Sequence, residues 1–458
     1  APSRGLGDVY KRQNMERTFI KDLAIKGEEE VLLRGWVHKI RDLAHVSFIM
    51  LRDKSGIIQL VCTKEQIKGL RLENSVEVRG IVRENEKALK GIEIEVSSID
   101  VTGKVYYDKL PFEIQGYKNK VSLETQLDYR TISLRIPKKK AIFKIQNEIE
   151  ESFRTYFKSN NFEEIHTPKI INSGTEGGSE MFTVDYFGRR AFLAQSPQFY
   201  KQMMVGAGFE RVFEVGYAYR AELHNTWRHL NEYVSLDVEM GFIKDEKDLM
   251  NVEEDFLRYM FKHVKETCGE ELKLFNIELP EKLEIPRIPL AEAQDILLRE
   301  FGKKSPVGNI DNEGEALFHK YVKETYDCDF VFLTDYPTAK RPMYAMECED
   351  NNEMTKSFDL IYKGVEITTG GQRIHDYEML KEKMERWGLK LEDFAFYLDT
   401  FKYGMPPHGG FAIGLERITM QMLDLGNIRE ASLFPRDMKR LICLLYTSPS
   451  PRDGATSR

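Results

Sequence analysis

Short runs of alternating apolar and polar residues fill the first part of the chain, between about residues 31 and 101. The runs are VLLRGWVHKI, SFIMLRD, IIQLVCT, SVEVRGIV and IEIEVSSI, and a DKSG turn separates the second from the third. Alternation with a period of two predicts half-buried strands, and a glycine-containing turn between two apolar runs predicts a hairpin. With one helical stretch near Lys64 to Leu70, the pattern predicts a small closed β-barrel.

A five-stranded barrel of this size is typical of the oligonucleotide-binding (OB) fold, which binds single-stranded nucleic acid by stacking bases on exposed aromatic rings beside cationic groups. Phe48 and Trp36 are the candidate rings, although a tryptophan that follows Gly35 is more typical of a core position. We therefore expect an N-terminal OB-fold domain at 14–112.

A second domain follows a stretch rich in proline, glycine and polar residues, YYDKLPFEIQGYKNKV, and we place the linker at 113–135. Apolar residues then recur at helical spacing, at Ile142, Ile145, Ile149, Phe153 and Phe157. Further on, β-rich runs such as RVFEVGYAYR, VSLDVEMGFI and SFDLIYKGVEITTG follow one another. Consecutive strands with helices outside them predict an α+β domain at 136–441, built on an antiparallel sheet flanked by helices.

The two ends of the chain differ from their neighbours in composition and periodicity. One DNA sequence that encodes Asp8 to Gln13 also encodes Cys443 to Thr447 on its reverse complement, which is typical of a library adapter flanking an insert. We therefore expect adapter-derived tails at 1–13 and 442–458, and Met15 as the native start.

Composition narrows the classes of protein that this chain resembles. It carries 67 basic and 74 acidic residues, a net charge of −7, so any nucleic acid must be bound through local basic patches. Outside the tails the cysteines are widely spaced and form no C-x-x-C pair, which indicates a reducing compartment. No apolar run approaches the roughly 18 residues of a membrane span, and no signal peptide follows Met15. We expect a cytoplasmic protein without membrane contact.

Two arginines in the second domain are candidates for binding phosphate. Arg220 ends the strand-like run FEVGYAYR, and Arg417 follows the glycine-rich run GGFAIG at the start of a helix. A guanidinium can hold a phosphate with two hydrogen bonds, although a single arginine at a strand end is usually a surface charge. The chain has no G-x-x-x-x-G-K-[ST] and no G-x-G-x-x-G that opens a helix, so a phosphate loop or a Rossmann turn is excluded.

Three segments together resemble the three motifs of the class II aminoacyl-tRNA synthetases. They are the helix from Ala141 through EEIHTPKI with Pro168, the stretch YRAELHNTWRHLNEYVSLDVEM, and GGFAIGLERI. Their order and spacing match, and the barrel lies upstream, as in the aspartyl, asparaginyl and lysyl branch. Within that branch FLAQSPQFYKQ and GGQRIH resemble the aspartyl enzymes, and the long TKSFDLIYKGVEITTGGQRIHDYEML with FKYGMPPHGGF looks like their archaeal type. The resemblance covers about Met15 to Leu441.

The resemblance implies ATP-dependent attachment of L-aspartate to tRNA(Asp) through an aspartyl-adenylate. Arg220 is expected to bind the α-phosphate, while Arg417 and Tyr233 enclose the adenine. The implied ATP-binding residues are Arg220, Glu222, Arg228, His229, Tyr233, Glu366 and Arg417, and those implied in catalysis are Arg220, Glu366 and Arg417. Asp359, Glu366 and Thr369 are the implied Mg²⁺ ligands, oxygen donors of the kind this ion prefers.

The same resemblance assigns residues to aspartate. Lys201 and Arg373 are expected to bind its side-chain carboxylate, since a carboxylate needs cations. Glu176, Gln198 and Asp237 are expected to meet its ammonium group. An asparaginyl enzyme is not expected to place a lysine at Lys201, so this residue favours aspartate.

For tRNA, the resemblance places Phe48, Gln59, Arg41 and His38 at the anticodon. Archaeal-type enzymes that accept only tRNA(Asp) tend to have a tryptophan at the position of His38 and a lysine near Leu89. Because this chain has neither, we expect a non-discriminating enzyme that also charges tRNA(Asn), with an amidotransferase acting downstream. The first motif further implies a homodimer.

Three other classes of protein are alternatives. An asparaginyl-tRNA synthetase would activate asparagine, and a paralogue of the catalytic domain that makes free asparagine would lack the barrel. A non-catalytic RNA-binding protein would not need Arg220, Glu366 and Arg417, all of which are present. The region at about 272–344 is the least informative, and we expect it to contribute packing only.

Overall fold

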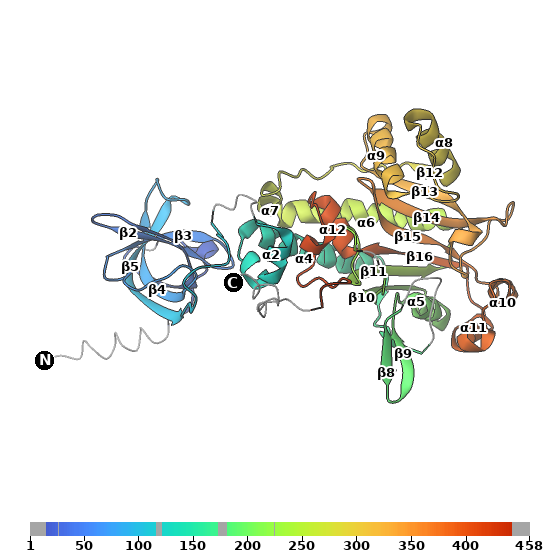
Figure 1. The fold of residues 1–458 in the computed structure, drawn as a ribbon, viewed down its shortest axis with the longest axis horizontal. Coiled ribbons are helices and arrows are strands. Elements are labelled where there is room, and N and C mark those ends of the chain that lie inside the picture. Colours follow the sequence, from blue (N-terminus) through green and yellow to red (C-terminus); the bar gives the residue numbers. More distant parts are fainter. Residues whose placement is uncertain (1–14, 26, 116–120, 173–180, 224, 442–458) are drawn as a thin grey trace, which may run out of the picture. The chain divides into compact units, whose positions relative to one another are not determined.

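The computed structural model describes residues 15–25, 27–115, 121–172, 181–223 and 225–441 (Figure 1). The chain divides into two compact units, Ala1–Val121 and Ser122–Arg458. The expected tails at 1–13 and 442–458 lie outside the described residues. The division falls inside the expected linker at 113–135, and the later part of that linker forms helices α2 and α3 of the second unit.

The first unit is a closed five-stranded barrel with strand order β1-β2-β3-β5-β4, as the alternating pattern predicts. All pairs are antiparallel except β3 with β5. Every second side chain points inward, and Val37, Ile49 and Leu60 are among the fully buried ones. The elements are η1 (Ile20–Asp22), β1 (Glu30–Asp42), β2 (Ser47–Arg52), β3 (Ile57–Cys62), β4 (Ser75–Glu84) and β5 (Ile92–Gly103).

The prediction of a helical stretch near Lys64 to Leu70 is wrong, because this segment forms consecutive turns. Lys68 N–H donates to the Glu65 carbonyl and Leu70 N–H to the Ile67 carbonyl. Each bond joins residues three apart, as in a turn, rather than four apart, as in an α-helix. Gly69 has a positive φ of 79°, a conformation that ends a helix. The segment is too short to form a stable helix without packing support.

The second unit is built on an eight-stranded sheet with strand order β12-β13-β14-β15-β16-β11-β10-β6 (Figure 1). The sheet is antiparallel, as expected, except for two parallel pairs at its edges, β12 with β13 and β6 with β10. A smaller sheet has the order β7-β9-β8. The strands are β6 (Glu163–Glu164), β7 (Ile170–Ile171), β8 (Thr183–Tyr186), β9 (Arg189–Leu193), β10 (Arg211–Tyr219), β11 (Glu232–Gly241), β12 (Arg287–Pro289), β13 (Phe330–Pro337), β14 (Met354–Tyr362), β15 (Val365–Arg373) and β16 (His408–Gly414).

Helices surround this sheet. The five apolar residues expected on one helix face are all buried on α4. The helices are α2 (Leu123–Asp128), α3 (Arg130–Ser133), α4 (Pro137–Ser159), α5 (Gln198–Met204), α6 (Glu246–Thr267), α7 (Gly269–Lys273), α8 (Leu290–Phe301), α9 (Asn312–Tyr326), α10 (Tyr377–Arg386), α11 (Ala395–Phe401) and α12 (Leu415–Met422). Short turns of helix are η2 (Val205–Phe209), η3 (Thr338–Lys340), η4 (Leu391–Phe394) and η5 (Ile428–Ala431).

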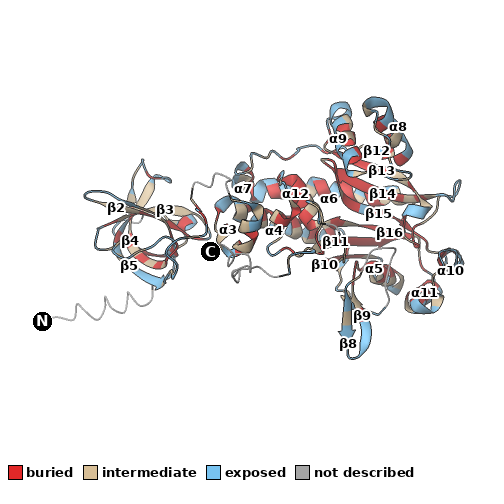
Figure 2. Cartoon of the chain, in the orientation of Figure 1, coloured by how far each residue is buried: buried red, intermediate tan, exposed pale blue. Residues whose placement is uncertain are grey.

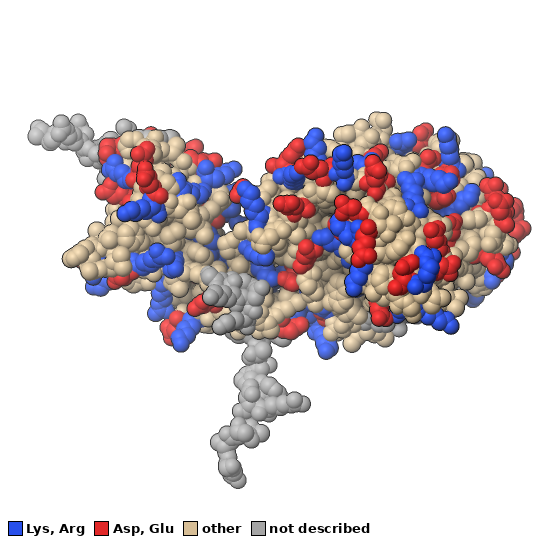
Figure 3. All heavy atoms as spheres, turned by 90° about the horizontal axis from the view of Figure 1, so that it is seen from above, with Lys and Arg blue, Asp and Glu red and all other residues tan. Residues whose placement is uncertain are grey.

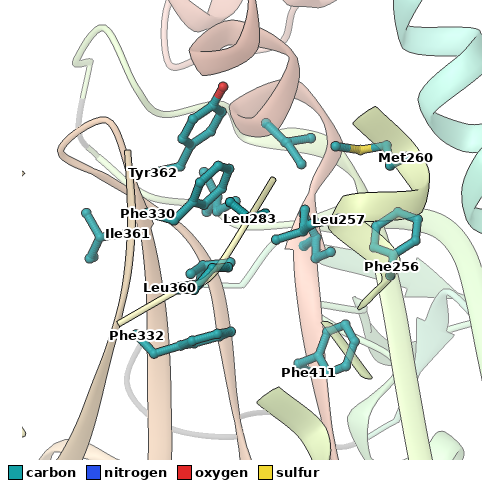
Figure 4. Close-up of a cluster of buried hydrophobic side chains, with 14 of the residues drawn as sticks. Phe256, Leu257, Met260, Leu283, Phe330, Phe332, Leu360, Ile361, Tyr362 and Phe411 are labelled. Atoms are coloured by element: carbon teal, nitrogen blue, oxygen red, sulfur yellow. The ribbon is translucent and has the colours of Figure 1, made fainter. Parts of the chain in front are cut away.

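The main core lies between α6 and the central strands. Phe256 and Leu257 of α6 lie in one cluster with Phe411 of β16 and with the aromatic residues of β13 and β14 (Figure 4). The rings of Phe330 and Tyr362 stack with centroids 3.9 Å apart. Burial follows the central strands, whereas much of the β8–β9 hairpin is exposed (Figure 2). This packing gives the sheet a rigid base for side chains at its strand ends.

Basic and acidic side chains are interspersed on the face drawn in Figure 3. Among the described residues, no helix combines the length and the apolar character needed to cross a bilayer.

Candidate functional site

The second and third motifs meet because their strands are neighbours in the sheet. β11 pairs with β10 on one side and with β16 on the other, and β16 also pairs with β15. A cavity opens over these strands. Every residue predicted to bind ATP lines it, together with Thr369: Arg220, Glu222, Arg228, His229, Tyr233, Glu366 and Arg417.

The two arginines predicted from the motifs lie beside Tyr233 and Glu366. The Arg220 guanidinium carbon lies 5.7 Å from the centroid of the Tyr233 ring. Arg417 lies in the first turn of α12 and donates from Nη1 to the Glu366 carbonyl at 2.9 Å, with Oε1 of Glu366 3.4 Å away. These contacts hold a cation and an aromatic ring in the cavity, where a purine and phosphates find complementary groups.

Other cations and carboxylates in the cavity restrain one another. Glu222 lies 3.9 Å from Arg220 Nη1 and 3.9 Å from His229 Nε2. Arg228 Nη1 lies 2.5 Å from Glu315 Oε2. Burial raises the pKa of Glu315 to about 7, although Arg228 acts in the opposite direction. Sequence reasoning missed Glu315, because it lies on α9 in the region expected only to pack.

A second residue that sequence reasoning missed is Glu416, which precedes Arg417. It lines the cavity, and its carboxyl accepts the Val234 N–H at 3.1–3.2 Å. Burial raises its pKa to about 8. Its position beside Arg417 in GLERI was the available signal.

Two of the three predicted Mg²⁺ ligands face the cavity. Thr369 Oγ1 donates to Glu366 Oε1 at 3.3 Å, so two hard oxygen donors lie side by side, a donor set that fits Mg²⁺. No group of three or more His, Cys, Asp or Glu side chains suited to a metal occurs in the described part of the chain. The remaining ligands of such an ion would be substrate phosphate and water, as is usual for Mg²⁺.

The third predicted ligand, Asp359, is placed differently. It is buried and pairs with Arg341 Nη2 at 2.8 Å, and the Arg341 guanidinium lies 3.7 Å from the Tyr336 ring centroid. Burial raises the pKa of Asp359, and Arg341 opposes this shift. Asp359 is therefore absent from the cavity lining among the described residues. Arg341 also belongs to the region expected only to pack.

Lys201 occupies a buried acidic setting on α5 and is only 2% exposed. Its Nζ lies 3.1 Å from Asp237 Oδ1 and 3.3 Å from Glu239 Oε2, and it donates to the Val238 carbonyl at 3.2 Å. Asp237 and Glu239 point to the same side because they are two residues apart on β11. Glu239 was missed from the sequence, although this spacing was the signal.

Arg373, at the end of β15, lies in the same buried group. It donates from Nε to Glu239 at 3.1 Å, and from Nη2 to Gln198 Oε1 at 3.3 Å and to the Gly410 carbonyl at 3.0 Å. Burial alone would raise the pKa of Glu239, but Arg373 and Lys201 outweigh it and the pKa is lowered. Four of the five residues predicted to bind aspartate thus converge, and Glu176 lies outside the described residues.

The close packing here requires glycine at Gly410. A Cβ at this position would lie 2.0 Å from the Val238 carbonyl and 2.2 Å from Glu239 Oε2. Both neighbours are buried, so neither has room to move. The glycine pair in GGFAIG therefore lets β16 approach the carboxylate that holds Arg373.

On the barrel, the predicted anticodon residues share the outer face of β1, β2 and β3. Arg41 lies opposite Phe48 in the β1–β2 pair, and Gln59 lies opposite Met50 in the β2–β3 pair. Gln59 donates to Glu93 at 2.8 Å. Trp36 is 37% exposed, so its expected place in the core is wrong. Its side chain follows the outward phase of β1, because the inward positions are Leu33 and Val37.

His38 sits at an irregularity in β1, where the pairing with β2 shifts between Val37 and Lys39. Bulges of this kind re-aim a side chain. The imidazole Nδ1 lies 2.8 Å from Arg52 Nη1, and Arg52 makes a buried ion pair with Glu73 at 2.6 Å. Burial and Arg52 together lower the pKa of His38. His38 borders an open cavity of about 1040 Å³ on this unit.

Comparison with known proteins agrees with this arrangement. The family described as tRNA synthetases class II (D, K and N) matches residues 122–438, and the OB-fold nucleic acid binding domain matches 31–102. The aspartate–tRNA(Asp/Asn) ligase of Aeropyrum pernix is 46% identical over 92% of this chain and 98% of its own. The aspartate–tRNA(Asp) ligase of Pyrococcus abyssi is 46% identical over 90% and 96%.

Among solved structures, asparaginyl-tRNA synthetase from Pyrococcus horikoshii with asparaginyl-adenylate superposes with a TM-score of 0.87 at 31% identity, over 93% of this chain and 99% of its own. The converging motifs, the barrel and the family match lead to one assignment. The chain belongs to the class II aminoacyl-tRNA synthetases of the aspartyl, lysyl and asparaginyl group and, within it, to the aspartate–tRNA ligases.

Proposed function

We propose that this ligase attaches L-aspartate to tRNA(Asn) as well as to tRNA(Asp). The observation that carries the proposal is His38, which borders an open cavity on the barrel and is held by Arg52. An indole at this position, as the resemblance gives for enzymes restricted to tRNA(Asp), would extend into that space. The small imidazole leaves room for either anticodon.

Leu89 supports the same proposal. It is 71% exposed in the turn between β4 and β5, where a lysine is expected in the restricted enzymes. Curated relatives at 46% identity include ligases named for tRNA(Asp) alone and ligases named for both tRNAs. Overall sequence identity therefore does not distinguish ligases for tRNA(Asp) alone from ligases for both tRNAs. The proposal rests instead on the barrel residues His38 and Leu89.

The chemistry proposed for the catalytic unit needs no protein nucleophile. The α-carboxylate of aspartate attacks the α-phosphorus of ATP and pyrophosphate leaves. A tRNA 3′-terminal hydroxyl then attacks the carbonyl carbon of the adenylate and takes the aspartyl group, while AMP leaves. Arg220 neutralises the α-phosphate, and Arg417 and Tyr233 enclose the adenine. Catalysis then rests on positioning and on charge neutralisation. Mg²⁺ held by Glu366 and Thr369 would neutralise further phosphate charge.

In the aspartate pocket, we propose that Lys201 and Arg373 receive the side-chain carboxylate and that Gln198, Asp237 and Glu176 receive the ammonium group. The buried cations already face Asp237 and Glu239, so their positions are fixed before the substrate arrives. A preorganised cationic pair favours a carboxylate over an amide.

The second candidate function is asparagine activation, which the resemblance in fold to an asparaginyl-tRNA synthetase favours. Lys201 argues against it, because a buried ammonium group makes a stronger hydrogen bond to the charged carboxylate of aspartate than to the neutral amide oxygen of asparagine. Pyrophosphate exchange with each amino acid separates the two functions: aspartate is expected to support exchange, and exchange with asparagine alone would refute our assignment.

We further propose a cytoplasmic homodimer, with subunits joined through α4 and the Pro168 segment, and an amidotransferase that converts Asp-tRNA(Asn). Light scattering tests the dimer, and a monomer at micromolar concentration would contradict it.

The experiment for tRNA choice is His38→Trp. We expect it to lower kcat/KM for tRNA(Asn) by about five- to 150-fold while tRNA(Asp) changes less, the range that about 1–3 kcal/mol for one lost base contact gives. Val101→Trp, at an exposed position of the same barrel to which no role in tRNA choice is assigned, is the matched control for adding an indole. Equal losses for both tRNAs in His38→Trp would refute the role of His38.

A further inference from the structure

A line of hydrogen bonds runs behind the aspartate pocket through three side chains. His408 Nδ1 lies 2.9 Å from the Pro406 carbonyl oxygen, and His408 Nε2 lies 2.8 Å from Gln202 Nε2. Gln198 Nε2 donates to Gln202 Oε1 at 3.1 Å. Arg373 Nη2 donates to Gln198 Oε1 at 3.3 Å. Gln202 is therefore the central member of a line that ends at Arg373.

The line is sealed from solvent. His408 and Gln202 are 0% exposed, and Gln198 is 5% exposed. Buried polar groups need partners within the protein, because leaving one unpaired costs about 1–3 kcal/mol. Each amide in the line must therefore present its donor to an acceptor and its acceptor to a donor.

Both ends of the line have a fixed polarity. A carbonyl oxygen only accepts, so the proton of His408 must sit on Nδ1, and Nε2 becomes an acceptor. Gln202 must then turn its NH₂ to His408 and its oxygen to Gln198. Gln198 in turn places its NH₂ toward Gln202 and its oxygen toward Arg373, whose guanidinium only donates. The two ends demand the same orientation of both amides.

Two side contacts reinforce this orientation. The Tyr397 hydroxyl donates to Gln202 Oε1 at 3.1 Å, and Gln198 Nε2 donates to Glu239 Oε2 at 3.3 Å. Burial lowers the pKa of His408 to about 4, so its imidazole is neutral near pH 7.

We propose that Gln202 is a positioning residue that, through Gln198, fixes the Arg373 guanidinium for the side-chain carboxylate of aspartate. This inference rests on the proposed role of Arg373 in binding aspartate. Arg373 makes its hydrogen bonds to described residues through Nε and Nη2, which leaves Nη1 to meet the substrate. If the amide of Gln198 turned over, its NH₂ would face the guanidinium, and the two donors would move apart.

The consequence is specific to the amino acid. A small displacement of Arg373 weakens the hold on a carboxylate that needs two aligned N–H groups, but it does not alter the ATP cavity on the neighbouring strands. Gln202 thus contributes to the selection of aspartate without touching it.

The test is Gln202→Met, which keeps the length of the side chain but ends the line. In pyrophosphate exchange we expect KM for aspartate to rise about five- to thirtyfold, the effect of one to two kcal/mol, with KM for ATP unchanged within about twofold. The matched control is Phe401→Leu, which disturbs packing beside the His408 ring, 6.1 Å away, without removing any hydrogen bond of the line. We expect it to lower stability and leave both KM values unchanged.

Two outcomes overturn the proposal. The first is an unchanged KM for aspartate in Gln202→Met, or an equal rise in Phe401→Leu. The second comes from ¹⁵N-histidine NMR spectra of the unaltered protein, in which the His408 signals are assigned by their loss in His408→Asn. We expect the proton of His408 on Nδ1. A proton on Nε2 would refute the proposed orientation of the amides even if Gln202→Met failed to fold. Arg373→Lys distinguishes a failure of the Gln202 proposal from a failure of the proposed aspartate pocket. An unchanged KM for aspartate there would refute the proposed pocket itself.

Discussion

Lys201→Met is the change that most directly probes how the pocket selects aspartate. The substitution keeps the apolar stem and removes a charge that lies 3.1 Å from Asp237 and 3.3 Å from Glu239. A charge-assisted hydrogen bond contributes about 1.5–3 kcal/mol, so losing one to the substrate carboxylate should raise KM for aspartate by about ten- to 150-fold. Asparagine has no side-chain charge to lose, so its weak exchange should change little.

The assay is pyrophosphate exchange with aspartate and asparagine at saturating ATP, together with urea unfolding. Removing one partner of a buried ion pair costs about 3–5 kcal/mol, so a loss of stability is also expected and is measured separately. KM for ATP should stay constant, because Lys201 is absent from the described lining of the nucleotide cavity. An unchanged preference for aspartate in a folded variant would refute the electrostatic reasoning.

Three further predictions follow from other parts of the chain. Phe48→Ala should raise KM for tRNA by about five- to 150-fold, as expected for losing 1–3 kcal/mol of base stacking, and leave pyrophosphate exchange intact; equal loss of exchange would contradict this. Arg52→Met should destabilise the barrel by about 3–5 kcal/mol in urea unfolding, because it removes one partner of a buried ion pair, and a change under 1 kcal/mol would argue against the pair. Burial raises the pKa of Glu253 to about 8. The folded state therefore holds a proton that the unfolded state has lost, and stability should fall from about pH 5 to pH 8 by up to about 1.4 kcal/mol per unit. In Glu253→Gln the loss of stability per pH unit should become smaller, as measured by unfolding at several pH values. An unchanged pH dependence would refute the raised pKa of Glu253.

The barrel strands and helix α4 could be predicted because local periodicity fixes them. The barrel runs and the buried face of α4 each follow one period over their whole length. The segment at Lys64 to Leu70 could not be predicted in this way, because seven residues carry too little pattern and Gly69 takes a positive φ. The parallel pairs at the sheet edges depend on chain connections that no periodicity reveals.

In the catalytic unit, the predicted ATP-binding residues line one cavity, as the resemblance implied. Most of the charged residues that pair with the predicted site residues were not predicted from the sequence. Glu315 and Arg341 lie far in sequence from the residues they pair with, Arg228 and Asp359. A charge in an amphipathic segment has the same sequence pattern whether it faces solvent or a distant cation. The burial of Asp359 therefore became visible only from the tertiary packing.

The central claim is that this ligase loads aspartate onto two tRNAs. The most direct measurement is aminoacylation of purified tRNA(Asp) and tRNA(Asn) with radiolabelled aspartate, side by side at one salt concentration. We predict that both tRNAs are charged at comparable rates. Charging of tRNA(Asp) alone would contradict the role assigned to His38 and Leu89, and charging of neither would contradict the proposed reaction itself.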